Sequence, residues 1–164
     1  MKDICIFWHQ YLVNDWERIV GEQFEKLVKS GLYNACKRVT CGVVCKPDDV
    51  VHHKEFMGNL ARQHSVKTKH KFKCYYTHEN NFEYITLSML QGFSNKYDAY
   101  VLYFHTKGVS IPLCSRYKKR REQKRVHMEK INILRWKMCV EKLNEGNMCC
   151  GTNKRKKFYT GNFW

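Results

Sequence analysis

The fold is indicated first by YVLYFHT, residues 100–106, which Lys107 and Gly108 follow directly. β-branched and aromatic residues without a polar alternation are typical of a strand that is covered on both faces, and Lys-Gly provides a turn at its end. Three further strands are predicted outward from this stretch: ICIFW at 4–8, RVTCGVVC at 38–45, and residues 72–77. We expect 4–8 and 100–106 to be interior strands of one sheet.

Helical patterns separate these strands. Asn14 and Glu17 form a plausible capping box before a helix that Gly31 stops. A short helix is predicted around residues 55–62, and apolar residues three apart predict another around residues 85–93. Further elements are expected as a helix at 126–144 and as short strands at 148–152 and 158–160. The alternation predicts a single α/β domain over residues 1–164, a three-layer sandwich with a mainly parallel sheet.

Length and composition agree with one folded domain. The chain has 164 residues, of which 43% are hydrophobic, and no apolar run is long enough to span a membrane. We therefore expect a cytoplasmic protein without a membrane span. The nine cysteines are an odd number and mostly lie within apolar stretches, which predicts reduced thiols. A zinc site is the alternative, with ligands drawn from Cys36, Cys41, Cys45, His52 and His53, although no Cys-x-x-Cys pair is present.

The positive charge is concentrated in the last third of the chain. The net charge is +15, and residues 111–164 hold 15 of the 30 Lys and Arg but only 4 of the 15 Asp and Glu. The basic residues form two runs, Arg116–Arg125 and Lys154–Lys157. We expect the first run to lie in a mobile basic loop at about 111–125. Both runs are candidates for contact with a polyanion, and a solvated basic surface is the alternative.

Candidate binding residues follow the first and fourth predicted strands. Ligands of open parallel sheets bind at the carboxyl ends of the strands, where this chain places an aromatic and amide cluster and a Lys-Gly pair. The residues concerned are Trp8, His9, Gln10 and Tyr11, then His105, Thr106, Lys107 and Gly108. Such side chains would stack on a base and bind a diphosphate, and an ordinary strand end is the alternative.

Few acidic residues are placed for catalysis. The candidates are Glu79, Glu83 and Asp98, together with Asp48 and Asp49 after the second predicted strand, and for Glu83 a helix-capping role is the alternative. The chain has no GxxxxGK, GxGxxG, GxSxG or HExxH motif, so common nucleotide-hydrolysing, dinucleotide-binding and hydrolase classes lack support.

Several stretches resemble the predicted glycosyltransferases of large DNA viruses and algae, a family that includes a capsid-glycosylating transferase domain of chloroviruses. The stretches are IFWH (6–9), KSGLYNAC (29–36), EYITLSML (83–90), YVLYFHTKGVS (100–110), RWKMCVEKLN (135–144), CCGTN (149–153) and TGNFW (160–164). The resemblance covers nearly the whole chain, and its HTKG and GNFW motifs are the most distinctive. It implies a glycosyltransferase-A-like fold, a nucleotide-sugar donor, and a glycan or glycoprotein acceptor. A viral member would act in the host cytoplasm.

The resemblance also implies roles for individual residues. Trp8, His9 and Tyr11 would line the nucleoside end of the site, Thr106, Lys107 and Gly108 would approach the diphosphate, and Gly161, Asn162 and Phe163 would lie on the acceptor side. Most enzymes of this fold hold Mn²⁺ or Mg²⁺ with an Asp-x-Asp motif at the end of the fourth strand. Here that place reads Phe104-His105-Thr106, which leaves His105 as a poor metal ligand. The chain also ends at Trp164, within the last motif, where we expect relatives to continue.

Three hypotheses follow for the function. The first is a glycosyltransferase, or the nucleotide-sugar-binding part of one, that acts by electrostatic stabilisation of the departing nucleoside diphosphate. The second is a basic α/β module that binds nucleic acid. The third is an inactive relative of the glycosyltransferases.

Overall fold

The computed structural model describes residues 2–67, 71–112, 114–152, 154–155, 158–159 and 164. Strands and helices alternate through the first two thirds of the chain. The strands are β1 (Asp3–Tyr11), β2 (Arg38–Val44), β3 (Phe72–Thr77), β4 (Ala99–His105), β5 (Lys154–Arg155) and β6 (Phe158–Tyr159). The helices are α1 (Trp16–Lys29), α2 (Leu32–Ala35), α3 (Asp49–Gln63), α4 (Tyr84–Ser94), α5 (Lys118–Glu129), the π-helix η1 (Lys130–Leu134) and α6 (Trp136–Asn144).

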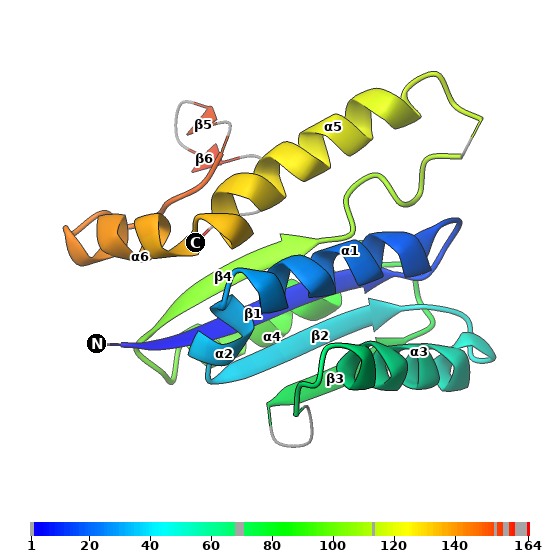
Figure 1. Ribbon diagram of the computed structural model, residues 1–164, viewed down its shortest axis with the longest axis horizontal. Coiled ribbons are helices and arrows are strands. Elements are labelled where there is room, and N and C mark those ends of the chain that lie inside the picture. The colour runs from blue at the N-terminus through cyan, green and yellow to red at the C-terminus, as the bar shows by residue number, and fades with distance from the viewer. Residues whose placement is uncertain (1, 68–70, 113, 153, 156–157, 160–163) are drawn as a thin grey trace.

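Four strands form one parallel sheet in the order β3-β2-β1-β4 (Figure 1). The prediction of an α/β sandwich with a parallel sheet is confirmed at this level. β1 lies inside the sheet as predicted, but β4 is an edge strand among the described residues, so the prediction that 100–106 is interior was wrong. Its apolar run reflects two covered faces, because Leu102 and Phe104 are buried on one side and Tyr103 on the other.

Helices cover both faces of the sheet. Alternate residues of β1 point in opposite directions, which places Ile6 and Trp8 in the main core and Cys5 and Phe7 in a smaller one. The main core packs against α1, α2 and α3, whereas α4 closes the smaller core with Met89, Leu90 and Phe93. The chain leaves β4 through a long loop and returns along α5, η1 and α6 beside the β4 edge (Figure 1). Among the described residues, we find no helix with the length and apolar character needed to cross a bilayer.

The predicted basic loop and the helix after it are different in the structure. Lys118 to Arg125 belong to α5 rather than to a loop, and the helix predicted at 126–144 is divided into α5, η1 and α6. Sequence periodicity missed α5 because its buried face is mainly ionic: Arg125 is 1% exposed and Glu129 is 0% exposed, with Met128 between them. Contacts of Arg125 with Glu22 and of Glu129 with Lys26 dock this helix on α1 without an apolar stripe.

Three smaller elements also differ from their predictions. The short helix predicted at 55–62 extends over all of α3. Asn14 does not cap α1, because its backbone is left-handed with φ of 53° and its side chain donates to the carbonyl of Val109. No strand forms over 148–152 beyond a bridge at Gly151; instead, Cys150 exchanges two backbone hydrogen bonds with Trp164.

Candidate functional site

A cleft of about 310 Å³ opens at the carboxyl ends of β1 and β4. Ligands of open parallel sheets bind at this edge. The segment before α4 forms the other wall of the cleft. Its lining residues come from three parts of the chain: His9 and Tyr11; Asn80, Phe82 and Glu83; and His105, Thr106, Lys107, Gly108, Val109 and Ser110. Five of the six residues assigned to nucleotide binding therefore line one cleft.

The pairing of β1 with β4 creates this arrangement. His9 and His105 are register partners at the end of the ladder, and the backbone N–H of Thr106 donates to the carbonyl of His9. The hydroxyl of Thr106 then accepts a hydrogen bond of 3.1 Å from the backbone N–H of Tyr11. The last residues of β1 and the first residue after β4 are thus held together before any ligand binds.

Trp8 differs from its expected position. It is fully buried in the core, where its ring stacks on Phe104 and its indole N–H donates to the side-chain oxygen of Gln23 at 2.9 Å. Consecutive strand residues face opposite sides of the sheet, so a strand that directs His9 to the cleft directs Trp8 away from it. Gln10 is also buried, with its side-chain oxygen 2.7 Å from the ring of His53.

Gly42 has no side chain, and this leaves room for α4 to approach His9. Nδ1 of His9 lies 2.9 Å from Oγ1 of Thr86, at hydrogen-bond distance, and both residues are buried. A Cβ at Gly42 would be only 2.1 Å from Oγ1 of Thr86. Gly42 therefore permits the close approach of α4, and Phe82 and Glu83 of the cleft directly precede this helix.

Glu83 supplies the carboxylate of the cleft. It occupies the N-cap position of α4, as the capping alternative expects, but its side chain makes no capping hydrogen bond. The carboxylate instead accepts a hydrogen bond from the hydroxyl of Tyr103 and lies 3.2 Å from Nδ1 of His105. Burial lowers the pKa of His105 to about 4 despite the opposing effect of Glu83, and burial also lowers the pKa of His9. Both imidazoles are therefore neutral at neutral pH.

Lys107 brings positive charge to the opposite wall. Burial lowers its pKa, the carboxylate of Glu83 opposes that effect, and the nearby cations Arg121 and Lys124 lower the pKa further. Gly108 explains how α5 comes so close. Its φ is +82°, and a Cβ there would lie 3.2 Å from Cβ of Arg121. The glycine thus makes room for α5, in addition to leaving its own backbone accessible.

The rim of the cleft is aromatic. Phe82 is 81% exposed and has a left-handed backbone with φ of 50°, which is uncommon for a bulky residue and often marks a functional segment. The amide of Asn80 donates to the hydroxyl of Tyr11 across the cleft at 3.3 Å. Sequence reasoning missed Phe82 and Asn80, for which the one available signal was an isolated aromatic in the polar segment 78–83.

The other predicted site residues are not gathered at the cleft. Asp98 lies at the opposite end of β4 and pairs with Lys2 at 2.6 Å. Glu79 is exposed and lines a separate small depression beside α4. Gly161, Asn162 and Phe163 lie outside the described residues, as do the side chains of the Lys154–Lys157 run.

The cleft offers few ligands for the divalent metal that the resemblance implies. Glu83 is the one carboxylate among its described lining residues and already contacts Tyr103 and His105, while the Thr106 hydroxyl accepts from Tyr11. Nowhere in the described ranges do three or more His, Cys, Asp or Glu side chains gather as metal ligands, and this includes the cysteines and histidines considered for zinc. The oxygen-rich coordination that Mg²⁺ and Mn²⁺ prefer is therefore not available from these residues.

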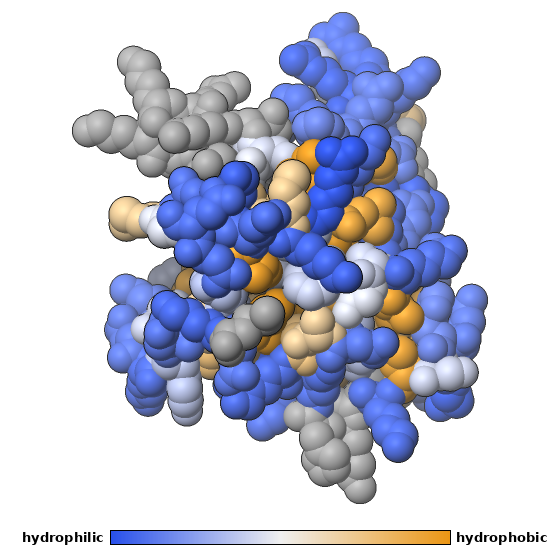
Figure 2. Space-filling view, turned by 60° about the vertical axis from the view of Figure 1, so that its left-hand side comes forward, coloured by the Kyte–Doolittle hydropathy of each residue, from blue (hydrophilic) through white to orange (hydrophobic). Residues whose placement is uncertain are grey.

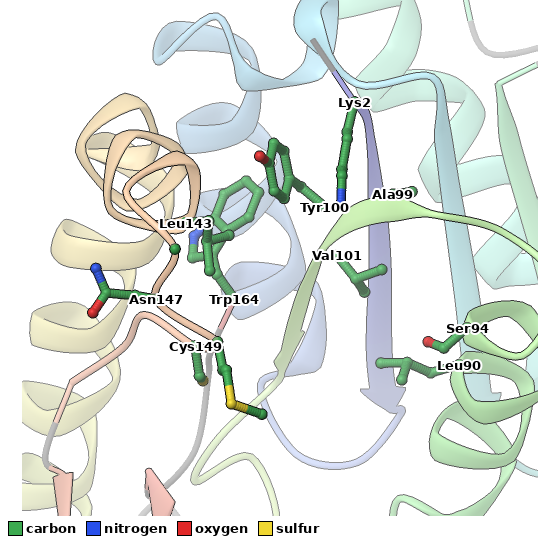
Figure 3. A pocket seen from close by; sticks show the side chains of 12 residues that line it. Lys2, Leu90, Ser94, Ala99, Tyr100, Val101, Leu143, Asn147, Cys149 and Trp164 are labelled. Atoms are coloured by element: carbon green, nitrogen blue, oxygen red, sulfur yellow. The ribbon is translucent and has the colours of Figure 1, made fainter.

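A second, larger hollow of about 480 Å³ lies along the β4 edge, between α4 and α6. Figure 2 shows hydrophobic side chains between hydrophilic ones on the side of the molecule that carries α6 and the start of β1. In Figure 3, Val101 of β4, Leu143 of α6 and Trp164 are seen around this hollow. Its lining is largely apolar, and Lys2 is already paired with Asp98, so the carboxyl-end cleft remains the better candidate for chemistry.

Comparison with known proteins adds no relative, because no family model, curated protein or solved structure matches this chain.

Proposed function

We propose that the protein is a glycosyltransferase, or the donor-binding part of one, that holds a nucleotide sugar in the carboxyl-end cleft. The observation that carries this proposal is the convergence of aromatic, cationic and carboxylate side chains at the ends of two adjacent parallel strands. Tyr11 and Phe82 supply flat surfaces for a base, Lys107 supplies positive charge for a diphosphate, and Glu83 lies on the facing wall. The volume of about 310 Å³ suits a small ligand.

In the proposed reaction, an acceptor hydroxyl attacks the anomeric carbon of the donor sugar. The new carbon–oxygen bond forms as the bond from the anomeric carbon to the diphosphate oxygen breaks, and its electron pair leaves with the nucleoside diphosphate. Glu83 takes the proton of the acceptor hydroxyl, and Lys107 stabilises the charge that develops on the leaving group. The neutral rings of His9 and His105 leave the cation of Lys107 to perform that stabilisation.

Donor binding is the first test. Calorimetric titrations with UDP-, GDP- and other nucleotide sugars should find at least one ligand, and truncation of the aromatic rim in Phe82→Ala should weaken it by about 1–3 kcal/mol. Tyr75→Ala is the control, because Tyr75 is also an exposed aromatic residue, on β3, but does not line the cleft. Absence of binding by every nucleotide sugar, or equal losses in both variants, would contradict the proposal.

Transfer is tested separately with the donor that binds. Glu83→Gln should retain donor affinity within about threefold and lose sugar transfer by at least about 100-fold, as expected for the loss of a general base. Transfer to an acceptor glycan is followed by mass spectrometry. Sugar transfer by Glu83→Gln at the wild-type rate would show that Glu83 is not the general base. Donor binding by the wild-type protein without any transfer would favour an inactive relative of the glycosyltransferases.

Nucleic-acid binding is a second candidate, favoured by the exposed basic side chains of α5. They are Lys119, Arg120, Arg121, Lys124 and His127, with Arg116 just before the helix and Lys130 after it. A polyanion held there would release counterions, so its affinity should fall steeply with salt, whereas a nucleotide sugar in the cleft should respond much less. Fluorescence anisotropy with a labelled oligonucleotide between low and physiological salt distinguishes the two.

A further inference from the structure

Among the residues that the structure describes around the cleft, cations outnumber carboxylates. Lys107 lines the cleft, and Gly108 beside it lies against Arg121 of α5, which carries Lys124 on the same face of the helix three residues later. Arg121 and Lys124 both lower the pKa of Lys107. Opposing them is the carboxylate of Glu83, while burial keeps both cleft histidines neutral. An excess of cations beside a partly buried lysine is the arrangement of an anion site.

The position of Arg121 is built into the fold. The segment after β4 makes its turn at Gly108, whose missing Cβ would otherwise meet Cβ of Arg121 at 3.2 Å. α5 is in turn fixed to α1 by the contact of Arg125 with Glu22 at 2.7 Å and by that of Glu129 with Lys26 at 2.5 Å. The backbone that carries Arg121 is therefore anchored beside the cleft, and its exposed guanidinium remains available to a ligand.

We propose that Lys107, Arg121 and Lys124 form a cationic cluster that neutralises the diphosphate of the donor in place of a divalent metal ion. This inference rests on the proposed function and names how that site holds its ligand. The residues present support it, because the described lining of the cleft offers a metal one engaged carboxylate, whereas Lys107 in the lining and Arg121 and Lys124 on the neighbouring α5 offer three cations to a phosphate. Arg121 would contribute paired N–H donors, and the two lysines would act as point charges.

The test compares two double variants of the full chain that lose the same charge. Arg121→Gln/Lys124→Gln removes the two cations on the cleft side of α5. Lys119→Gln/Lys130→Gln is the control, because 100° per residue places those exposed lysines on the opposite side of the helix from Arg121. Thermal denaturation checks that both variants fold. Affinity for UDP, GDP and inorganic pyrophosphate is then measured by calorimetry, with Mn²⁺ and with EDTA.

We expect the cleft-side variant to lose about tenfold in affinity per cation removed, and the control less than about threefold. Binding by the wild-type protein should be the same with EDTA as with Mn²⁺. Equal losses of affinity in both double variants, or wild-type binding that EDTA abolishes, would contradict the proposed role of the cationic cluster.

The probes separate this proposal from the proposed function. Pyrophosphate binding that needs Arg121 and Lys124, without any preference for a nucleotide, would support the cluster and contradict the nucleotide-sugar function. Nucleotide binding that depends on Mn²⁺ and is unchanged in Arg121→Gln/Lys124→Gln would support the nucleotide-sugar function and contradict the cationic cluster.

Discussion

Gly42→Ala should damage both the fold and the cleft, although it adds a single methyl group. A Cβ at this position would lie 2.1 Å from Oγ1 and 3.1 Å from Cβ of Thr86, and 3.0 Å from Cγ2 of Ile85. Ordinary contacts begin at 3.4 Å, so β2 and α4 would have to separate by more than an ångström at this point. The contacts involve β-branched side chains close to the helix backbone, which leaves little freedom to relieve the overlap.

The cost has two parts. Overpacking of a tight site typically costs about 1–3 kcal/mol, and loss of the hydrogen bond between Thr86 and His9 would add about 1 kcal/mol. We therefore expect the free energy of unfolding to fall by about 2–4 kcal/mol. Displacement of the start of α4 would also move Glu83 and Phe82, so any ligand of the cleft should bind more weakly.

Gly92→Ala is the control, because Gly92 lies on α4, the helix that packs against Gly42. A Cβ at Gly92 meets no atom within 4 Å, and alanine is favoured over glycine inside a helix by about 1 kcal/mol. The two substitutions, measured by urea denaturation with circular dichroism, should thus shift the free energy of unfolding in opposite directions. A Gly42→Ala protein as stable as the wild type would show that α4 does not pack on β2 as described.

Three further predictions concern the cleft and its support. Lys107→Ala should weaken binding of a nucleoside diphosphate by about 1.5–3 kcal/mol while the fold is retained, and equal calorimetric affinities would exclude the contact. The pKa values of His53 and His105 are lowered by burial to about 4, so the unfolded chain binds protons more readily. Stability should therefore be full above about pH 6.5 and decline from there towards pH 4, and a flat profile in urea denaturation over this range would contradict it. Arg125→Met leaves the buried carboxylate of Glu129 without one of its partners and should cost about 3 kcal/mol in the same assay, whereas an unchanged midpoint would mean that the pair is not buried.

The sheet was predictable from the sequence because its strands carry their own signal. The apolar run at 4–8 and the aromatic run at 72–77 correspond to β1 and β3, and the residues that follow 100–106 do meet those that follow 4–8. Strand order was not predictable in detail. An edge strand whose two faces are both covered by helices has the same apolar pattern as an interior strand, which is why β4 was misplaced.

The parts of the site that were missed depend on contacts between distant residues. Nothing local to Gly42 indicates that its missing side chain accommodates Thr86, which lies 44 positions later in the chain. Trp8 was assigned to the cleft because it is adjacent to His9, but the alternation of a strand separates the two across the sheet. Arg121 was visible only as one charge in a basic run, and its relation to Lys107 arises from the turn at Gly108.

The basic residues between Arg116 and Arg125 therefore fall into two groups, one that points inward to ion-pair partners and one that is exposed. Lys118 is directed inward, 2.7 Å from the carboxylate of Asp15, and the guanidinium of Arg125 is buried against Glu129. Gln23 extends this network to the strand end, because its amide donates both to Glu129 and to the carbonyl of His105. Asp15 and Glu22 satisfy these inward cations and so hold α5 beside α1, which places Arg121 of the same helix next to Gly108 at the cleft. Ion pairs to α1 together with the proposed contact to an anion would need basic residues on two faces of α5, which accounts for the high net charge of this segment.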